Sequence, residues 1–311
     1  MVATIFSQGR FNMRKVLLAT TALVALNVSA ASADVSIGGT AVFEIYSPSK
    51  GAQTYTSDGS IVITGSTTTD SGLTVKAVHD MKFEGAGSAN DAYISVSGDF
   101  GTINAGLTDG ALDRKDGNLA ANMDLETTAT GSVSNGDSNM ANTIIGGDSQ
   151  NISFFAPAIN GLEVYGELQA DGAGSGIGVN YSIAGIGLMY QVGQEVSAGG
   201  ADFATKTDAS AFGAKASMAG FTVQAGYATF DAKGSVAKRK SNDIGVSYSM
   251  DSIKLIATSA RGKRGTRTDK YSNFGVSYTI APGVVAMVES GQSTKNGTNA
   301  DATWAALSVS F

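Results

Sequence analysis

The segment Phe221-Thr222-Val223-Gln224-Ala225-Gly226-Tyr227 alternates apolar side chains with polar ones or glycine at a period of two. Successive side chains of a β-strand point to opposite faces of the sheet, so this segment has one apolar and one polar face. The same alternation ends the chain, where Leu307, Val309 and Phe311 are separated by serines. Helical spacing is not sustained anywhere after residue 34, so the chain is predicted to be all-β.

A repeated motif indicates how the strands are connected. Gly245-Val246-Ser247-Tyr248-Ser249-Met250 recurs 30 residues later as Gly275-Val276-Ser277-Tyr278-Thr279-Ile280, and that interval fits one hairpin of two ~10-residue strands. Tight turns alternate with longer polar stretches along the chain, including stretches at 261–268 and 293–299. This asymmetry is typical of an up-and-down sheet whose two rims face different compartments, and sixteen strands are expected.

The N-terminal residues have the three-part pattern of a secretory signal. Three basic residues precede an apolar stretch at 16–28, and small residues follow at 31–33. The apolar stretch is too short to span a bilayer as a helix. We therefore expect a cleaved signal peptide at 1–33, starting at the first methionine or at Met13, and a single domain at 34–311.

The composition excludes several classes of function. The chain has no cysteine and one histidine, which excludes disulfides, thiolate metal sites and a cysteine nucleophile. Residues 34–311 hold all 27 acids and 21 − 3 = 18 bases, a net charge of about −9, so nucleic-acid binding is not expected. Catalysis would depend on His79 with Asp80, but neighbours in a strand point to opposite faces and cannot pair. We therefore do not expect an enzyme.

The charged residues of the strands lie on the face opposite the apolar one. They are Glu44, Lys76, Glu163, Glu167, Lys215, Lys254 and Glu289. A soluble protein turns its charged face outward around a dry core, whereas a membrane barrel has lipid outside and water inside. Backbone groups in hydrocarbon must pair internally, so a spanning sheet has to close. Sixteen strands behind a secretory signal favour an antiparallel transmembrane β-barrel, which at this strand number is known to leave an aqueous channel.

Over its length after residue 33, the sequence resembles the general porins of Gram-negative bacteria. The resembling pieces are residues 35–39, the turn and strand at 97–106, and the turn ending in Asn160-Gly161-Leu162. Phe311 matches the C-terminal signal that such proteins present to the outer-membrane assembly machinery. The resemblance implies one porin barrel over 34–311 in the outer membrane. It also implies a homotrimer and passive passage of small hydrophilic solutes, with no cofactor.

The longest connection runs from Asp109 to about Gly147, and in general porins the corresponding loop folds into the lumen and narrows it. Its acidic residues are the candidates for a pore constriction: Asp109, Asp113, Asp116, Asp124 and Glu126. Candidates for the pore wall are Glu44, Lys76, Glu163 and Glu167. Carboxylates in a narrow passage of low dielectric favour cations, and Val42 stands where general porins often carry arginine, so we expect a mild cation preference. An acidic loop in solvent is the other interpretation.

Basic residues gather in two late connections, at 233–240 and 261–267. They fit three roles: a solvated rim of the vestibule, a binding surface for anionic lipopolysaccharide, or a contact with acidic loops of a neighbour.

Other functions fit part of the pattern. A substrate-specific channel for sugars or anions is one, but Trp304 faces inward with no aromatic row expected beside it. A non-conducting adhesin barrel is another, and conductance in planar bilayers would separate it from a channel. Asp109, Asp113 and Asp116 are a weak candidate for binding calcium, although their spacing matches no calcium-loop motif.

Overall fold

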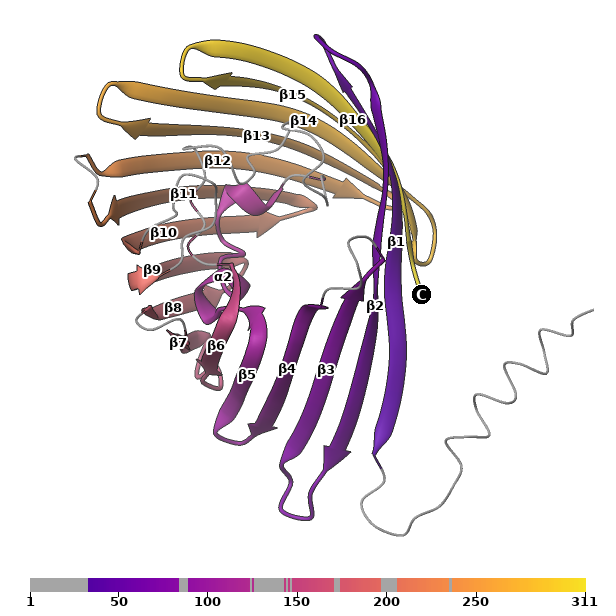
Figure 1. The fold of residues 1–311 in the computed structure, drawn as a ribbon, viewed down its shortest axis with the longest axis vertical. Helices are drawn as coiled ribbons and strands as arrows, with labels where there is room; N and C mark the ends of the chain where they lie inside the picture. The colour runs from indigo at the N-terminus through magenta and orange to yellow at the C-terminus, as the bar shows by residue number, and fades with distance from the viewer. Residues whose placement is uncertain are drawn as a thin grey trace, which may run out of the picture.

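Sixteen antiparallel strands close into one barrel, as the sequence predicted (Figure 1). In this computed structural model every strand pairs with its neighbours in the chain, and β1 pairs with β16 to close the ring. The first half comprises β1 (Asp34–Pro48), β2 (Thr54–Thr68), β3 (Thr74–Lys82), β4 (Ala89–Gly98), β5 (Gly101–Asp109), β6 (Asp148–Phe155), β7 (Leu162–Gln169) and β8 (Ser175–Ile183). The second half comprises β9 (Ile186–Val196), β10 (Thr207–Met218), β11 (Phe221–Ala232), β12 (Arg239–Met250), β13 (Ile253–Arg264), β14 (Arg267–Ala281), β15 (Val284–Lys295) and β16 (Thr298–Ser310). Two short helices, α2 (Ala111–Arg114) and the 3₁₀ helix η1 (Ala120–Met123), lie between β5 and β6.

The structure describes residues 33–83, 89–123, 125, 143, 145, 147–170, 174–196, 206–234 and 237–311. Nearly all of the expected signal peptide lies outside these residues, as do the candidate constriction residues Asp124 and Glu126. In this part of the chain, no helix combines the length and apolar character needed to cross a membrane.

Period-two alternation sorts the side chains between two environments. In β9, Ile186, Leu188 and Tyr190 are exposed on the outer face, whereas Met189 and Gln191 are each 1% exposed on the inner face. An apolar face this exposed would aggregate in water, but it matches the hydrocarbon of a bilayer. Because every described strand is paired on both sides, the sheet has no open edge to leave in lipid.

Tight turns join the strands at the rim that carries both chain ends. Asn160 and Gly161 have φ of 50° and 83°, and Ala219 and Gly220 have φ of 49° and 82°. Two successive residues with positive φ form the type I′ turn, which matches the twist of a two-residue hairpin. Glycine at the second position adopts this conformation without steric cost.

Two of the expected long connections are instead tight turns. β13 runs to Arg264 and β14 begins at Arg267, while β15 runs to Lys295 and β16 begins at Thr298. The expectation of loops at 261–268 and 293–299 was therefore wrong. Polar side chains occupy both faces of a strand once it rises out of the membrane, so the apolar alternation that marks a strand ends before the strand does.

The last residue extends the closing seam. The Phe311 amide donates to the Gly39 carbonyl oxygen, and the Gly39 amide donates to the Phe311 carbonyl oxygen, both at 3.0 Å. A Cβ on Gly39 would lie 2.9 Å from the Phe311 ring. The terminal aromatic therefore lies where only glycine fits on β1.

Candidate functional site

The connection after β5 turns into the barrel and runs along its inner wall (Figure 1). Helix α2 lies against β6, β7 and β8, and η1 lies against β11, β12 and β13. Leu125 packs farther round, in a cluster with Ile256 and Trp304. The described parts of this inner loop therefore follow the wall from β6 to β16, as the resemblance to general porins implied.

Three carboxylates on the inner face hold the backbone of this loop. Glu167 on β7 accepts a hydrogen bond from the Leu112 amide at 3.0 Å, and Asp243 on β12 accepts one from the Ala120 amide at 3.3 Å. Glu289 on β15 accepts a third, from the Leu125 amide, at 2.8 Å. All three carboxylates are at most 4% exposed. Hydrogen bonds to ionised acceptors are stronger than neutral ones, so these acids act as loop anchors.

The wall also donates to the loop. The Asn180 side-chain amide on β8 donates to the Lys115 carbonyl oxygen at 3.1 Å, and the Gln224 amide on β11 donates to the Gly117 carbonyl oxygen. Buried backbone donors and acceptors of an irregular segment both need partners. The wall supplies both kinds, so these backbone groups of the loop are satisfied without water.

A row of glycines gives the loop its seat. A Cβ built on any of six inward-facing glycines would lie within 3.1 Å of a loop atom: Gly176, Gly187, Gly213, Gly226, Gly245 and Gly275. A Cβ built on Gly176 would lie 2.5 Å from Leu112, and one on Gly245 would lie 2.6 Å from the Met123 sulfur. The loop side chains therefore occupy the volume that a wall side chain would fill, and we call these six residues the glycine seat.

The wall beneath the loop is dry. Leu112 and Leu119 from the loop are buried with Met189, Ala211 and Phe230 from the inner faces of β9, β10 and β11. Apolar inner-face residues therefore pack against the apolar side chains of the loop, and these contacts replace water. The channel is thus confined to the part of the lumen that the loop leaves open.

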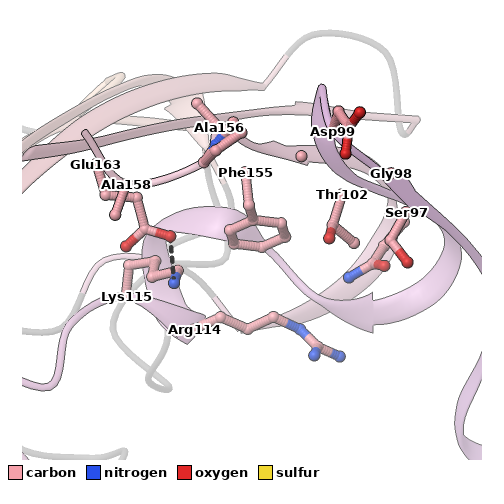
Figure 2. Close-up of a pocket in the computed structure, with 13 residues that line it drawn as sticks. Ser97, Gly98, Asp99, Thr102, Arg114, Lys115, Phe155, Ala156, Ala158 and Glu163 are labelled. Atoms are coloured by element: carbon pink, nitrogen blue, oxygen red, sulfur yellow. Dashed lines mark hydrogen bonds and ion pairs between the residues drawn. The ribbon is translucent and has the colours of Figure 1, made fainter.

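A cavity of about 830 Å³ lies between α2 and the tight turns after β4 and β6 (Figure 2). Ser97, Thr102 and Asn104 line it from the strands, while Arg114 and Lys115 reach it from the loop. Its lining mixes hydroxyl, amide and charged groups, which suits a hydrated passage.

Two basic residues of the loop face this cavity in fixed positions. Arg114 donates from Nε to the Asp109 carbonyl oxygen at 3.2 Å and from Nη2 to the Thr108 hydroxyl, and it lies 5.1 Å from the Tyr93 ring centre. The Lys115 ammonium lies 2.7 Å from the Glu163 carboxylate, as the dashed line in Figure 2 marks.

The structure separates the predicted constriction residues. Asp109 ends β5 with outward parity, opposite that of the buried Thr108, and Asp113 is half-buried in α2. Asp116 is only 7% exposed, and its backbone amide donates to the Asp113 carbonyl oxygen. Their role in a constriction stays a prediction, as does that of Asp124 and Glu126.

The four pore-wall candidates all lie on inner-face positions, but only two contact the open lumen. Lys76 is exposed on β3, and Glu163 faces the cavity paired with Lys115. Glu44 is 1% exposed on β1, and Glu167 lies under the loop as an anchor. Strand parity gave the face of each residue, but it could not show which positions the loop covers.

The aromatic surroundings of Trp304 differ from the expectation. Tyr46 lies directly opposite it across the closing seam and packs into the same cluster, so Trp304 does have an inward aromatic neighbour. Both belong to the packed region around Leu125, and Trp304 is 0% exposed. Trp304 therefore offers no aromatic surface to a passing sugar.

Two of the sequence hypotheses, catalysis by His79 and calcium binding, need several side chains to lie close together. His79 is on the outer face of β3, in register with Ile63 and Ala92, whereas Asp80 faces inward. Among the described residues, no three acidic or histidine side chains are grouped closely enough to hold a metal. The calcium candidate therefore has no ligand set in that part of the chain.

Comparison with known proteins agrees with this architecture. A family model for Gram-negative porins matches residues 19–299. An anion-selective porin from Comamonas acidovorans superposes with a TM-score of 0.75 at 14% identity, covering 90% of this chain and 100% of that one. OmpF of Salmonella typhi, in complex with daunomycin, gives a TM-score of 0.70 at 14% identity over 89% and 97% of the two chains. A trimer form of OmpT from Vibrio cholerae gives 0.70 at 12% identity over 90% and 99%. Comparison with curated protein sequences found no match.

The structures at this level of identity share the fold, and the family match covers most of the sequence. A closed barrel with an apolar outer face, a wall-bound inner loop and a polar cavity beside it is the architecture of a diffusion channel. The chain therefore belongs to the Gram-negative porins, the outer-membrane channels that small hydrophilic solutes cross by passive diffusion.

Proposed function

We propose that this porin is exported with its signal peptide at 1–33, works as a homotrimer, and conducts ions with a mild preference for cations. The observation that carries the passage of solutes is the loop bound along β6–β16, because it leaves the polar inner face of β2–β5 open. Single-channel recording of the detergent-extracted protein tests this directly. Stepwise conductance with closures in threes supports the proposal, whereas a protein that never conducts overturns it.

The cation preference rests on charge balance. Residues 34–311 carry 27 acids against 18 bases, and Asp80 lies directly opposite Asp91 on the inner face of β3 and β4. Arg114 and Lys76 oppose this negative potential, so the preference is expected to be mild. Reversal potentials in a salt gradient measure it. Neutralising Asp113, Asp116 and Asp124 together should move the reversal potential toward anion selectivity, and an anion preference of the unmodified channel would refute the proposal.

The homotrimer is supported by the outer face of β3. His79 is exposed there between Ile63 and Ala92, about 13 Å above the start of the strand at a rise of ~2.5 Å per tilted residue. That height is near the middle of an apolar band ~25 Å tall, where a polar ring facing lipid is costly. A second copy covering β3 removes this cost.

Light scattering of the purified protein in detergent gives the number of chains per particle. The trimer should dissociate in His79→Asp but persist in Ala225→Asp, which places the same charge on the outer face of β11, half-way round the barrel. A monomeric unmodified protein would rule out the homotrimer, and a trimer that survives His79→Asp would rule out this face as its interface.

We do not expect calcium to affect the channel. Conductance and selectivity recorded with added calcium and then with a chelator should agree, since the described residues group no ligand set.

A further inference from the structure

Four basic side chains gather on the outer face of β12, β13 and β14, at the rim opposite the chain ends. Lys240, Arg261, Lys263 and Lys270 all have outward parity and are exposed. We call these four residues the outer basic patch. They project away from the lumen, so the diffusion pathway makes no use of them.

The strand register sets like charges directly against each other. Lys240 pairs in register with Lys263, and Arg261 pairs with Lys270. The other neighbours of these four residues in register are all uncharged: Thr229, Asn242, Thr268 and Thr294. Like charges directly opposite each other destabilise a sheet unless a counter-charge is supplied.

The described part of the chain supplies no counter-charge to these four residues. Other basic residues at the same rim are paired: Lys238 lies 2.8 Å from Asp231, and Lys233 pairs with Glu195. No ion pair involves any member of the outer basic patch among residues 206–234 and 237–311. Within these described residues, the repulsion between the four cations is not offset by an ion pair.

The height of the patch identifies the environment it meets. A strand tilted by ~40° climbs ~2.5 Å per residue along the barrel axis. Arg261 therefore lies about 20 Å above Ile253 at the foot of β13, and Lys263 about 25 Å above it. The apolar band of such barrels is ~25 Å tall, so these cations lie at the level of the lipid headgroups and not high in solvent.

Below the patch, the outer face is apolar, as expected for a surface in contact with hydrocarbon. Ile244, Leu255 and Phe274 lie exposed below the patch, where hydrocarbon covers them. Strands on either side carry no base at the level of the patch: β11 has Asp231 and β15 has Gln292 on their outer faces. The positive charge is therefore confined to three neighbouring strands.

We propose that the outer basic patch binds the phosphate groups of a phosphorylated glycolipid headgroup in the outer leaflet, the chemistry of lipopolysaccharide. This inference rests on the proposed outer-membrane function and adds a defined lipid site to it. Several phosphates on one headgroup match several cations spread over three strands. An acidic loop of a second copy is a weaker occupant, because β13 lies far round the barrel from β3, where the protomer contact is proposed.

The test compares two variants with the same change in net charge. One replaces the outer basic patch (Lys240→Gln, Arg261→Gln, Lys263→Gln and Lys270→Gln), and the control replaces four exposed lysines elsewhere (Lys50→Gln, Lys233→Gln, Lys238→Gln and Lys295→Gln). Each folded protein is titrated in detergent with purified lipid A, with lipid A stripped of its phosphates, and with inorganic phosphate. The heat-dependent gel shift of the barrel confirms folding in each case.

The unmodified protein should prefer phosphorylated over dephosphorylated lipid A by at least about tenfold, and the patch variant should lose that preference while the control keeps it. Inorganic phosphate at the same concentration should neither bind nor compete. Equal binding by the patch variant and the control would overturn the inference, as would competition by inorganic phosphate alone. Conductance separates the two proposals: a protein that conducts but does not discriminate between the lipids refutes only the lipid site.

Discussion

Removing one loop anchor should release the inner loop from the wall. Glu289 accepts the Leu125 amide at 2.8 Å, and its other oxygen accepts hydrogen bonds from Asn273 and Tyr271 on the wall. A hydrogen bond to a charged acceptor contributes about 1.5–3 kcal/mol. Of the three hydrogen bonds to Glu289, only the one from Leu125 is broken when the loop lifts. Glu289→Ala should therefore raise the fraction of molecules in which the inner loop is lifted by about 10- to 150-fold.

Because the chain has no cysteine, a single introduced cysteine can be labelled selectively to test this prediction. Met123 is 4% exposed and faces Gly245 beneath the loop, so a Met123→Cys probe reacts with a thiol reagent only when the segment opens. When reclosing is fast, the labelling rate follows the opening equilibrium. Labelling should therefore accelerate in Glu289→Ala by the same factor, and Glu289→Gln, which keeps one acceptor oxygen, should restore part of the protection.

Glu163→Ala is the matched control, because it also removes a carboxylate from the inner face. Glu163 is bound to the Lys115 ammonium with both side chains partly exposed, and such a pair contributes at most about 1 kcal/mol. Its loss should leave Met123→Cys labelling nearly unchanged. Equal acceleration in Glu163→Ala and Glu289→Ala would show that lumen charge, and not the backbone anchor, holds the loop.

Three further predictions concern the seat, the cavity and the seam. Gly275→Val should lift the loop and speed labelling of the same probe, because its Cβ would lie 2.8 Å from Leu125 and overpacking costs about 1–3 kcal/mol, whereas Gly65→Val, where nothing lies within 4 Å, should not. Arg114→Gln should move the reversal potential toward stronger cation selectivity, because it removes a fixed positive charge from the cavity lining; no movement would place the constriction elsewhere. Gly39→Val should lower the yield of heat-modifiable barrel, because its Cβ would meet the Phe311 ring and the Ser60 carbonyl oxygen on β2, and a normal yield would argue that the seam relaxes.

The fold could be predicted because one period runs through the whole chain. Residues such as Leu188 and Tyr190 alternate with inner-face residues, and a period of two fixes faces without any knowledge of strand order. The faces of Glu44, Lys76, Glu163 and Glu167 followed from the same rule. Strand ends were less predictable. β14 already begins at Arg267, within a stretch expected to be a loop, because a strand outside the membrane has polar residues on both faces.

The site was less predictable than the fold, because it depends on contacts between the loop and strands far away in sequence. Leu112 meets Gly176, and Leu125 meets Glu289, and no local pattern links either pair. The sequence nevertheless contained a signal for the contact between the loop and the wall. Glycine weakens a strand interior, so glycines on one parity of several consecutive strands indicate that another backbone approaches there.

The glycine seat also explains how such a channel sets its width. Two separate properties decide the open area: which side chains line the free wall of β2–β5, and how deeply the loop sits against the opposite wall. A wall side chain at Gly226 or Gly275 would push the loop toward the lumen, because Leu119 and Leu125 already lie within 2.8 Å of the positions their Cβ atoms would take. Modest substitutions in the seat should therefore narrow the passage or release the loop without altering any residue that a solute touches. The glycine seat therefore offers a way to change the width of the passage while every charged side chain of the loop and of the free wall is kept.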